Sequence, residues 1–308
     1  MQGLELCRGF YQDCGAPMLA EQFPELAPRL AAGLMGSGSE CFGFDDEISR
    51  DHDFEPGFCL FVPDELADRR TLFLLERAYA KLPREYAGFR RAPVSPVGGA
   101  RHGVFTNSGF FRRCLGREAL TELWHWFAVP ESALAEVTNG ELFCEGDGSF
   151  AAARQALLHM PEDVRRKKLA GHLLLMAQSG QYNYRRCLAH GEPGAAQLAL
   201  GEFVRHTLSA VFLLNGRYQP YYKWSFRALR ELPRLSSLAG PLECLLAGGG
   251  EPEDKAALIE SVAGEIISVL AEQALSHAAG NYLEPHAYAV NETVSDISLR
   301  NESVLYGV

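Results

Sequence analysis

The chain has 308 residues, enough for two domains of ordinary size, and it is 47% hydrophobic and 22% charged, as in a folded protein. Its formal net charge of −10 argues against general nucleic-acid binding, because such proteins usually carry a surplus of Lys and Arg. The longest apolar runs, such as 57–62 and 210–214, are far shorter than the roughly 20 residues that cross a bilayer. We therefore expect no membrane partner.

The eight cysteines are scattered, without a Cys-x-x-Cys pair or a Cys/His group at zinc-binding spacing. This pattern is typical of reduced thiols in the cytoplasm, and a disulfide framework is the weaker alternative. The first residues lack the basic segment and apolar core of a signal peptide. These features predict a cytoplasmic protein.

In chain order, the first 82 residues predict helix, loop, strand and helix. Apolar residues at helical spacing predict a helix over 16–34. A loop rich in Gly and Ser covers 33–46 and leads into a short helix. Apolar and aromatic residues predict a strand over 53–62, and the Pro and acidic residues after it begin a helix over 63–82.

The next segment mixes turns with short elements. Residues 83–103 are rich in Pro and contain a Gly-Gly pair, which predicts a loop or hairpin. A second strand is predicted over 104–111, and helices over 117–127 and 131–137. Asn-Gly and Gly-Asp-Gly sequences make 138–149 a turn-rich segment.

After residue 150 the pattern changes to long helices. These are predicted over 150–159, 161–179, 195–215, 220–231, 253–279 and 284–301. The sequence thus predicts an α+β fold, in which residues 1–150 form a small mixed sheet flanked by helices and residues 151–308 form an all-helical bundle.

The segment over 33–62 carries the chemistry. A Gly-Ser turn includes Ser37, Gly38 and Ser39, and Asp51 and Asp53 follow at the head of the predicted strand. Alternate residues of a strand face the same side, so the two carboxylates would hold Mg²⁺ or Mn²⁺ side by side. The glycines would let backbone N–H groups approach phosphates closely.

This spacing of Gly-Ser and Asp-x-Asp resembles the signature of the DNA polymerase β-like nucleotidyltransferase superfamily. The blocks over 38–53, 212–215 and 218–224 are similar to an uncharacterised bacterial branch of that superfamily, a domain of unknown function. The blocks over 212–215 and 218–224 also resemble the helical C-terminal domain of kanamycin nucleotidyltransferases. The resemblance implies a nucleotidyltransferase fold in residues 1–150 and a helical domain in 151–308.

The resemblance also implies roles for individual residues. Asp51 and Asp53 would be the catalytic metal ligands, and Ser37, Gly38 and Ser39 would bind the phosphates of a nucleoside triphosphate (NTP). Lys223 matches a helical lysine that helps to bind the triphosphate in kanamycin-type enzymes. The implied reaction moves a nucleoside monophosphate to a hydroxyl group of a small molecule or protein, and releases pyrophosphate.

The superfamily usually places a third carboxylate on a neighbouring strand, and residues 104–107 contain no acid. Glu141 and Glu145 are candidate third acids if the segment around them returns to the sheet. Without a third acid, the protein would be a nucleotide-binding sensor with little or no turnover.

Other interpretations stay open for these residues. Asp51 and Asp53 are alternatively solvated acids at the end of a strand, and the serines are alternatively caps of a short helix. Lys223 is alternatively an ordinary solvated lysine. The helices over 253–279 and 284–301 would supply the surface of a homodimer or of an interaction protein.

Overall fold

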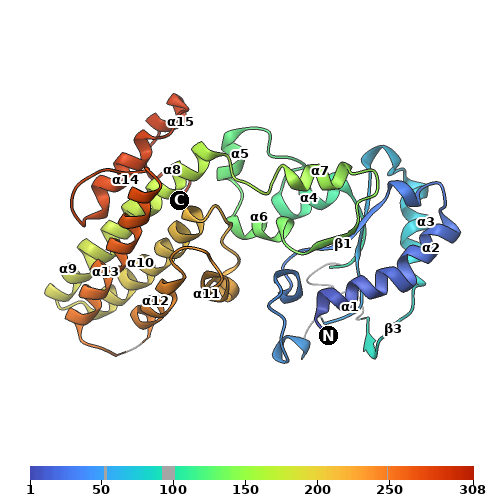
Figure 1. The fold of residues 1–308 in the computed structure, drawn as a ribbon, viewed down its shortest axis with the longest axis horizontal. Helices are drawn as coiled ribbons and strands as arrows, with labels where there is room; N and C mark the ends of the chain where they lie inside the picture. The colour runs from blue at the N-terminus through green and yellow to red at the C-terminus, as the bar shows by residue number, and fades with distance from the viewer. Residues whose placement is uncertain (52–53, 92–100, 248) are drawn as a thin grey trace. The chain divides into compact units, whose positions relative to one another are not determined.

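The computed structural model describes residues 1–51, 54–91, 101–247 and 249–308, except for the side chains of Arg50 and Asp51. The chain divides into two compact units (Figure 1). The first comprises residues 1–121 and 129–158, and the second comprises residues 122–128 and 159–308. The sequence placed the boundary at residue 150. Every helix in the described ranges is too short or too polar to span a bilayer.

The first unit is built on a four-stranded mixed sheet with the order β5-β2-β1-β6. β1 is antiparallel to both of its neighbours, and β2 is parallel to β5. The strands are β1 (Ala31–Leu34), β2 (Cys59–Val62), β5 (Gly103–Thr106) and β6 (Glu141–Cys144). A separate two-stranded hairpin joins β3 (Glu85–Tyr86) to β4 (Phe89–Arg90).

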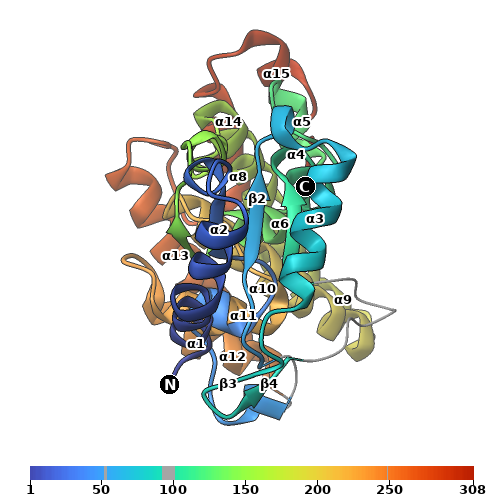
Figure 2. The same ribbon diagram turned by 90° about the vertical axis from the view of Figure 1, so that its right-hand side faces the viewer.

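Helices cover both faces of this sheet. Successive residues of β2 point to opposite faces, and all four are buried. Leu60 packs into one core with Phe10 and Leu75, whereas Phe61 stacks on Phe150 from the opposite face with ring centroids 3.7 Å apart. Figure 2 shows β2 between two helices of the first face, α2 and α3. The helices are α1 (Gly3–Phe10), α2 (Ala16–Gln22) and α3 (Arg69–Ala80) on the first face, and α4 (Asn107–Leu115), α6 (Glu131–Thr138) and α7 (Ser149–Gln155).

The predicted helix over 16–34 is wrong in its second half. α2 ends at Gln22, and residues 31–34 form β1 in the middle of the sheet. Pro24 and Pro28 explain the early end, because proline lacks a backbone N–H and disfavours helical conformation in the residue before it. The Gly-Ser turn therefore follows a strand and not a helix.

Other boundaries also differ from the prediction. β2 begins at Cys59 and not at residue 53, and a one-turn 3-10 helix over Ile48–Asp51 lies ahead of it. The second predicted strand ends at Thr106, whose hydroxyl accepts a hydrogen bond from Gly109 N (2.9 Å) and caps α4. The predicted helix over 117–127 is confirmed only for α5 (Leu123–Phe127), and the turn-rich segment contains β6.

The second unit is an all-helical bundle, as predicted. Its core is formed by apolar residues of α8, α10, α12, α13 and α14, and α8 packs against α10 and α14. Its helices are α5, α8 (Glu162–Met176), α9 (Arg185–Ala189), α10 (Pro193–Leu214), α11 (Tyr222–Arg230), α12 (Ala239–Leu246), α13 (Pro252–Glu272), α14 (Leu283–Glu292) and α15 (Ile297–Asn301). A π-helix over Ala177–Tyr184 joins α8 to α9.

Candidate functional site

The Gly-Ser turn at the end of β1 is held in a fixed shape. Asn139 clamps Gly36: its Oδ1 accepts from Gly36 N (3.0 Å), and its Nδ2 donates to Gly36 O (2.7 Å). Arg154 donates in turn to the carbonyl of Asn139 (2.7 Å). Gly36 has φ = 135°, which L side chains rarely adopt. The chain then enters a 3-10 helix over Ser39–Phe42, and no side chain caps its N-terminus.

Gly38 is required by a buried ion pair beside the turn. Glu40 is only 7% exposed and is paired with the guanidinium of Arg101. A Cβ atom at position 38 would collide with both charged groups. The glycine therefore lets the backbone approach this ion pair closely. Ser37 is exposed and Ser39 is half-buried.

A pocket of about 180 Å³ lies against the start of this turn. Its wall includes Leu34 from β1, Gly36 and Ser37 from the turn, and side chains from the β5 edge, α4 and α6. The titratable side chains in the wall are Arg101, His102, Arg113, Cys114 and Glu136. A strand end, a glycine turn and two arginines thus share one cavity of the first unit.

His102, in the wall of this pocket, has one ring nitrogen without a hydrogen-bond partner among the described residues. Its Nδ1 lies 3.5 Å from Glu55 Oε1, and its Nε2 is buried without a hydrogen-bond partner in the described part of the chain. A buried ring nitrogen without a partner is uncommon, because its desolvation is not offset by a hydrogen bond.

Burial controls the protonation of Glu136 and Cys114 in the pocket and of two further thiols of the first unit, those of Cys7 and Cys59. It raises the pKa of the Glu136 carboxyl, so this side chain takes up a proton more readily than an exposed glutamate. Burial, reinforced by the charge of Glu136, raises the pKa of Cys114 to about 11. Burial also raises the pKa of Cys7 and Cys59, each to about 12. These three thiols stay protonated at neutral pH, which argues against thiolate chemistry.

The two predicted metal ligands fall at a gap in the description. Asp51 is the last residue of the 3-10 helix over Ile48–Asp51, and its side chain is not described; Asp53 lies outside the described residues. The prediction that a strand carries Asp51 is wrong, because Asp46 starts this helix by accepting from Ser49 N (3.0 Å). The pairing of the two carboxylates around a metal stays a prediction.

The candidate third acids have different surroundings. Glu141 is on the sheet, where β6 pairs with β1, but its carboxylate is occupied by Arg8, whose Nε donates to Oε1 (3.0 Å). Glu145 follows β6 and is exposed. Neither lines the pocket beside the turn. Among the side chains that the structure describes, no group of three His, Cys, Asp or Glu is placed to hold a metal ion.

Lys223 lies in the second unit, on the first turn of α11. Its side chain is exposed, and its Nζ lies 4.9 Å from the ring centroid of Trp224. This cation–π contact restricts the side chain but leaves the ammonium group available to an anion.

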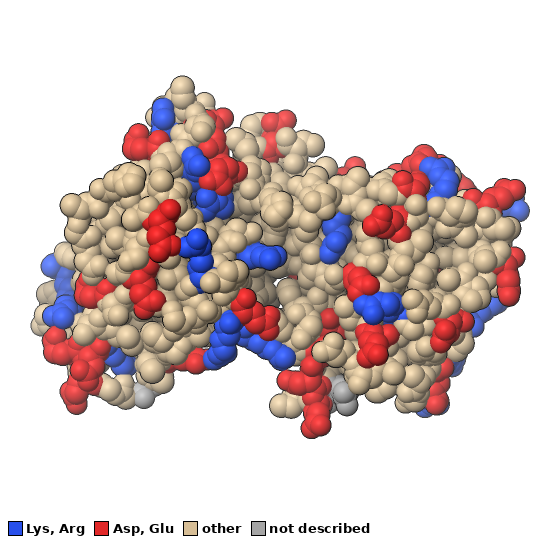
Figure 3. Space-filling view, in the orientation of Figure 1, with Lys and Arg blue, Asp and Glu red and all other residues tan. Residues whose placement is uncertain are grey.

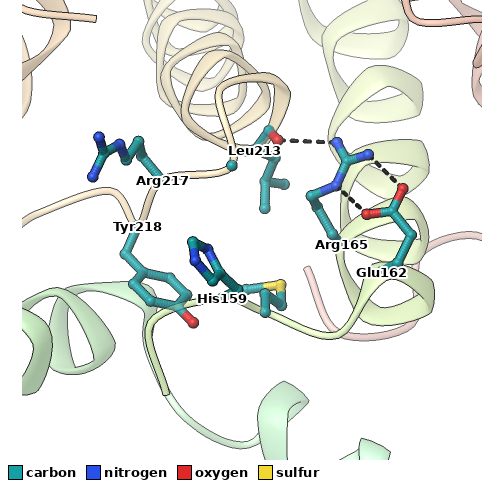
Figure 4. A pocket seen from close by; sticks show the side chains of 8 residues that line it. His159, Glu162, Arg165, Leu213, Arg217 and Tyr218 are labelled. Atoms are coloured by element: carbon teal, nitrogen blue, oxygen red, sulfur yellow. Dashed lines mark hydrogen bonds and ion pairs between the residues drawn. The ribbon is translucent and has the colours of Figure 1, made fainter. Parts of the chain in front are cut away.

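A second basic region occurs in the same unit, in a pocket of about 150 Å³ (Figure 4). Arg165 is neutralised there by a bidentate ion pair with Glu162 and also donates to Leu213 O (3.0 Å). Arg217 and His159 are exposed in its wall, and Figure 4 shows the guanidinium of Arg217 pointing away from the Arg165–Glu162 pair. Lys223 does not line this pocket.

The titratable groups of the pocket beside the turn were not predicted from the sequence. Arg101 and His102 follow a Pro- and Gly-rich segment that resembles an ordinary loop, whereas Arg113 and Glu136 come from two different helices. Only Glu136 carried a local signal, since it lies among apolar residues of a predicted helix.

Comparison with known proteins gives one partial sequence match and one structural likeness. Residues 126–225 match the model of a domain of unknown function, DUF4037. The structure resembles a nucleotidyltransferase-like protein from Exiguobacterium sibiricum 255-15 with a TM-score of 0.37 and 12% identity, over 85% of this chain and 76% of the other. No curated protein matches the chain. The chemistry therefore has to be inferred from the residues themselves.

Proposed function

We propose that the protein is a metal-dependent nucleotidyltransferase, which moves a nucleoside monophosphate from an NTP to a hydroxyl acceptor. The observation that carries this proposal is the clamped Gly-Ser turn at the end of β1, with a pocket beside it that contains Arg101, Arg113 and Glu136. Arg101 is already paired with Glu40, and the positive charge of Arg113 beside a glycine turn suits a polyphosphate.

The Gly-Ser turn has the chemistry of a phosphate cradle. Gly38 keeps the backbone free of side-chain bulk, and Ser37 and Ser39 contribute hydroxyl donors. Arg113 adds positive charge from α4. Together these groups would hold the β- and γ-phosphates, so that catalysis is mainly positioning and neutralisation of charge.

Asp51 and Asp53 would hold Mg²⁺ or Mn²⁺, because their carboxylate oxygens are the ligands that hard divalent cations prefer. When bound, the metal neutralises charge on the phosphates and on the leaving pyrophosphate. Lys223 is also proposed to bind phosphate oxygens of the NTP, as its exposed ammonium group allows.

The reaction forms a bond between the acceptor oxygen and the α-phosphorus and breaks the bond from that phosphorus to the β-phosphate bridging oxygen. Glu136 is the proposed base for the proton of the acceptor hydroxyl, since its raised pKa brings it closer to neutral pH. We prefer it to Glu141, which is paired with Arg8, and to the exposed Glu145.

The acceptor is proposed to be a small molecule or a protein side chain. The net charge is −10, and Figure 3 shows Lys and Arg interspersed with Asp and Glu on the face in view. Such a surface does not favour general nucleic-acid binding.

The test is release of pyrophosphate from each NTP with Mg²⁺ or Mn²⁺, with water or added hydroxyl compounds as acceptor. Asp51→Asn and Asp53→Asn should abolish release and leave the melting temperature nearly unchanged. Glu47→Gln is the matched control, because Glu47 is exposed in the same acidic segment and we assign it no chemistry. Full activity in both aspartate variants would sink the proposal.

A second candidate function is a nucleotide sensor without turnover. The occupation of Glu141 by Arg8 favours it, because the expected third acid is then missing from the neighbouring strand. This function requires saturable NTP binding that depends on Mg²⁺ and no release of pyrophosphate above background. Asp51-dependent release would exclude it.

A further inference from the structure

A third pocket, of about 400 Å³, lies within the helical unit, and its lining residues differ from those that were given roles above. It is bordered by the π-helix that joins α8 to α9 and by the first turns of α14. Figure 1 shows α8 and α14 next to each other, in agreement with their packing. The side chains that matter here are Leu174, Tyr182, Tyr282, Glu284, Tyr288 and Leu305.

The three tyrosines are large aromatic residues left substantially in contact with solvent. Tyr182 is 50% exposed, Tyr282 39% and Tyr288 49%. Single exposed aromatic residues are ordinary, but three around one cavity are a feature of binding sites. Leu174 and Leu305 add apolar surface to the same wall.

The π-helix is the local feature that brings Tyr182 into this wall. Gly180 packs so closely on the ring of Phe203 in α10 that a Cβ atom would collide with it. Ser179 donates to Leu175 O (2.6 Å). π-helical turns are rare and occur often at functional sites. The sequence thus keeps a small residue where the widened turn meets the core.

The electrostatics of the pocket favour a positive charge. Glu284 is half-buried, and it has no ion-pair partner within the described ranges. Among the residues that the structure describes, no Lys or Arg lines the cavity. Burial raises the pKa of the Tyr282 phenol, and the charge of Glu284 adds to this rise. The guanidinium of Arg186 lies 5.5 Å from the ring centroid of Tyr182 outside the pocket lining, so one face of that ring already attracts a cation.

We infer that this pocket binds an organic ammonium group, with the positive charge against the tyrosine rings and the Glu284 carboxylate and the carbon substituents against Leu174 and Leu305. Tyrosine faces and a carboxylate attract such a group together, because the ring quadrupole and the anion both favour positive charge. Glu284 and Tyr288 are one helical turn apart on α14 and so lie on the same face. The inference does not depend on the proposed transferase activity.

The experiment measures binding to the full chain by calorimetry at fixed ionic strength. The probes are choline, ethanolamine and the uncharged carbon isostere of choline. Choline or ethanolamine should bind saturably, and the isostere at least tenfold more weakly. The stronger of the two amines distinguishes a quaternary ammonium from a primary one. Equal binding of choline and its isostere, or no binding of either amine, would overturn the inference.

Variants locate the site. Glu284→Gln should weaken binding of the better amine roughly tenfold, equivalent to about 1.4 kcal/mol. Tyr288→Leu, which removes a half-exposed ring, should weaken it a few-fold. Glu292→Gln is the matched control, since Glu292 is exposed at the end of the same helix and outside the pocket, and it should bind as the parent does. Unchanged affinity in Glu284→Gln would contradict the assignment, and unchanged melting temperatures ensure that the variants are folded.

Discussion

Asn139→Ala is the change that tests most directly how the Gly-Ser turn is held. Asn139 makes two hydrogen bonds to the backbone of Gly36, at 3.0 and 2.7 Å, across 103 residues of sequence. Its own backbone lies at φ −82° and ψ −170°, which alanine adopts without strain. The substitution therefore removes the clamp and little else.

The expected loss is about 2 kcal/mol in the free energy of unfolding, from about 1 kcal/mol for each hydrogen bond. For a unit of this size, that loss lowers the melting temperature by about 4–8 °C. The NTP should also bind several-fold more weakly, because a loosened turn must be ordered when the phosphates bind.

The assay is differential scanning calorimetry together with NTP titration. Asn139→Asp keeps the acceptor for Gly36 N and loses the donor, so it should melt between the parent and Asn139→Ala. Asn301→Ala, at an exposed position of the second unit, should melt as the parent does. A melting temperature of Asn139→Ala within about one degree of the parent would refute the view that this clamp shapes the turn.

Three further predictions concern buried charge. Glu40→Gln should lower the free energy of unfolding, measured in urea, by about 3 kcal/mol, because Arg101 loses its buried partner. The control Glu47→Gln should change it by less than about 0.5 kcal/mol. Lys167→Met should lower the free energy of unfolding by about 2–3 kcal/mol and speed amide hydrogen exchange near Glu302. The reason is that the buried ammonium group donates to Glu302 O (2.8 Å) and to Asn291 Oδ1 (2.8 Å). Unchanged exchange would count against this prediction. Burial lowers the pKa of His206 from 6.5 to about 4, and that of His172, with which it shares a 2.9 Å contact, falls as well. The contribution of neutral His206 to the free energy of unfolding is therefore fully present above pH 6.5 and is lost as the pH falls through about 4, by roughly 3 kcal/mol. A free energy of unfolding that stays constant over this pH range would contradict the assignment.

The helices of the second unit could be predicted from sequence because long apolar periods are a strong signal. α10 and α11 begin and end within about two residues of the expected positions. Two predicted helices are too long. The helix predicted over 253–279 ends at Glu272, and the one predicted over 284–301 is two helices, α14 and α15.

The sheet was harder to predict, because its strands have four residues each and two of them carry misleading signals. β1 is Ala-Ala-Gly-Leu, buried on both faces, so it shows no alternation of polar and apolar residues. β6 lies between Asn-Gly and Gly-Asp-Gly sequences and looks like part of a turn. Only pairing with distant residues makes either segment a strand.

The candidate site also contains residues that could be recognised from sequence and residues that could not. The Gly-Ser turn could be recognised locally, because a cluster of glycines and serines between two predicted elements is a strong signal for a turn. The arginines and Glu136 could not, because the tertiary fold alone brings residues 101, 113 and 136 to one pocket. Their long-range placement has no counterpart in local spacing.

The most direct test of the proposed function is a thermal-shift titration with the four NTPs, with and without Mg²⁺, on the parent, Asp51→Asn and Glu47→Gln. A ligand at 100 times its Kd adds about 2.7 kcal/mol, a rise of several degrees. The proposal predicts a Mg²⁺-dependent rise with at least one NTP that is lost in Asp51→Asn and kept in Glu47→Gln. A rise that persists in Asp51→Asn, or none with any NTP, would contradict it.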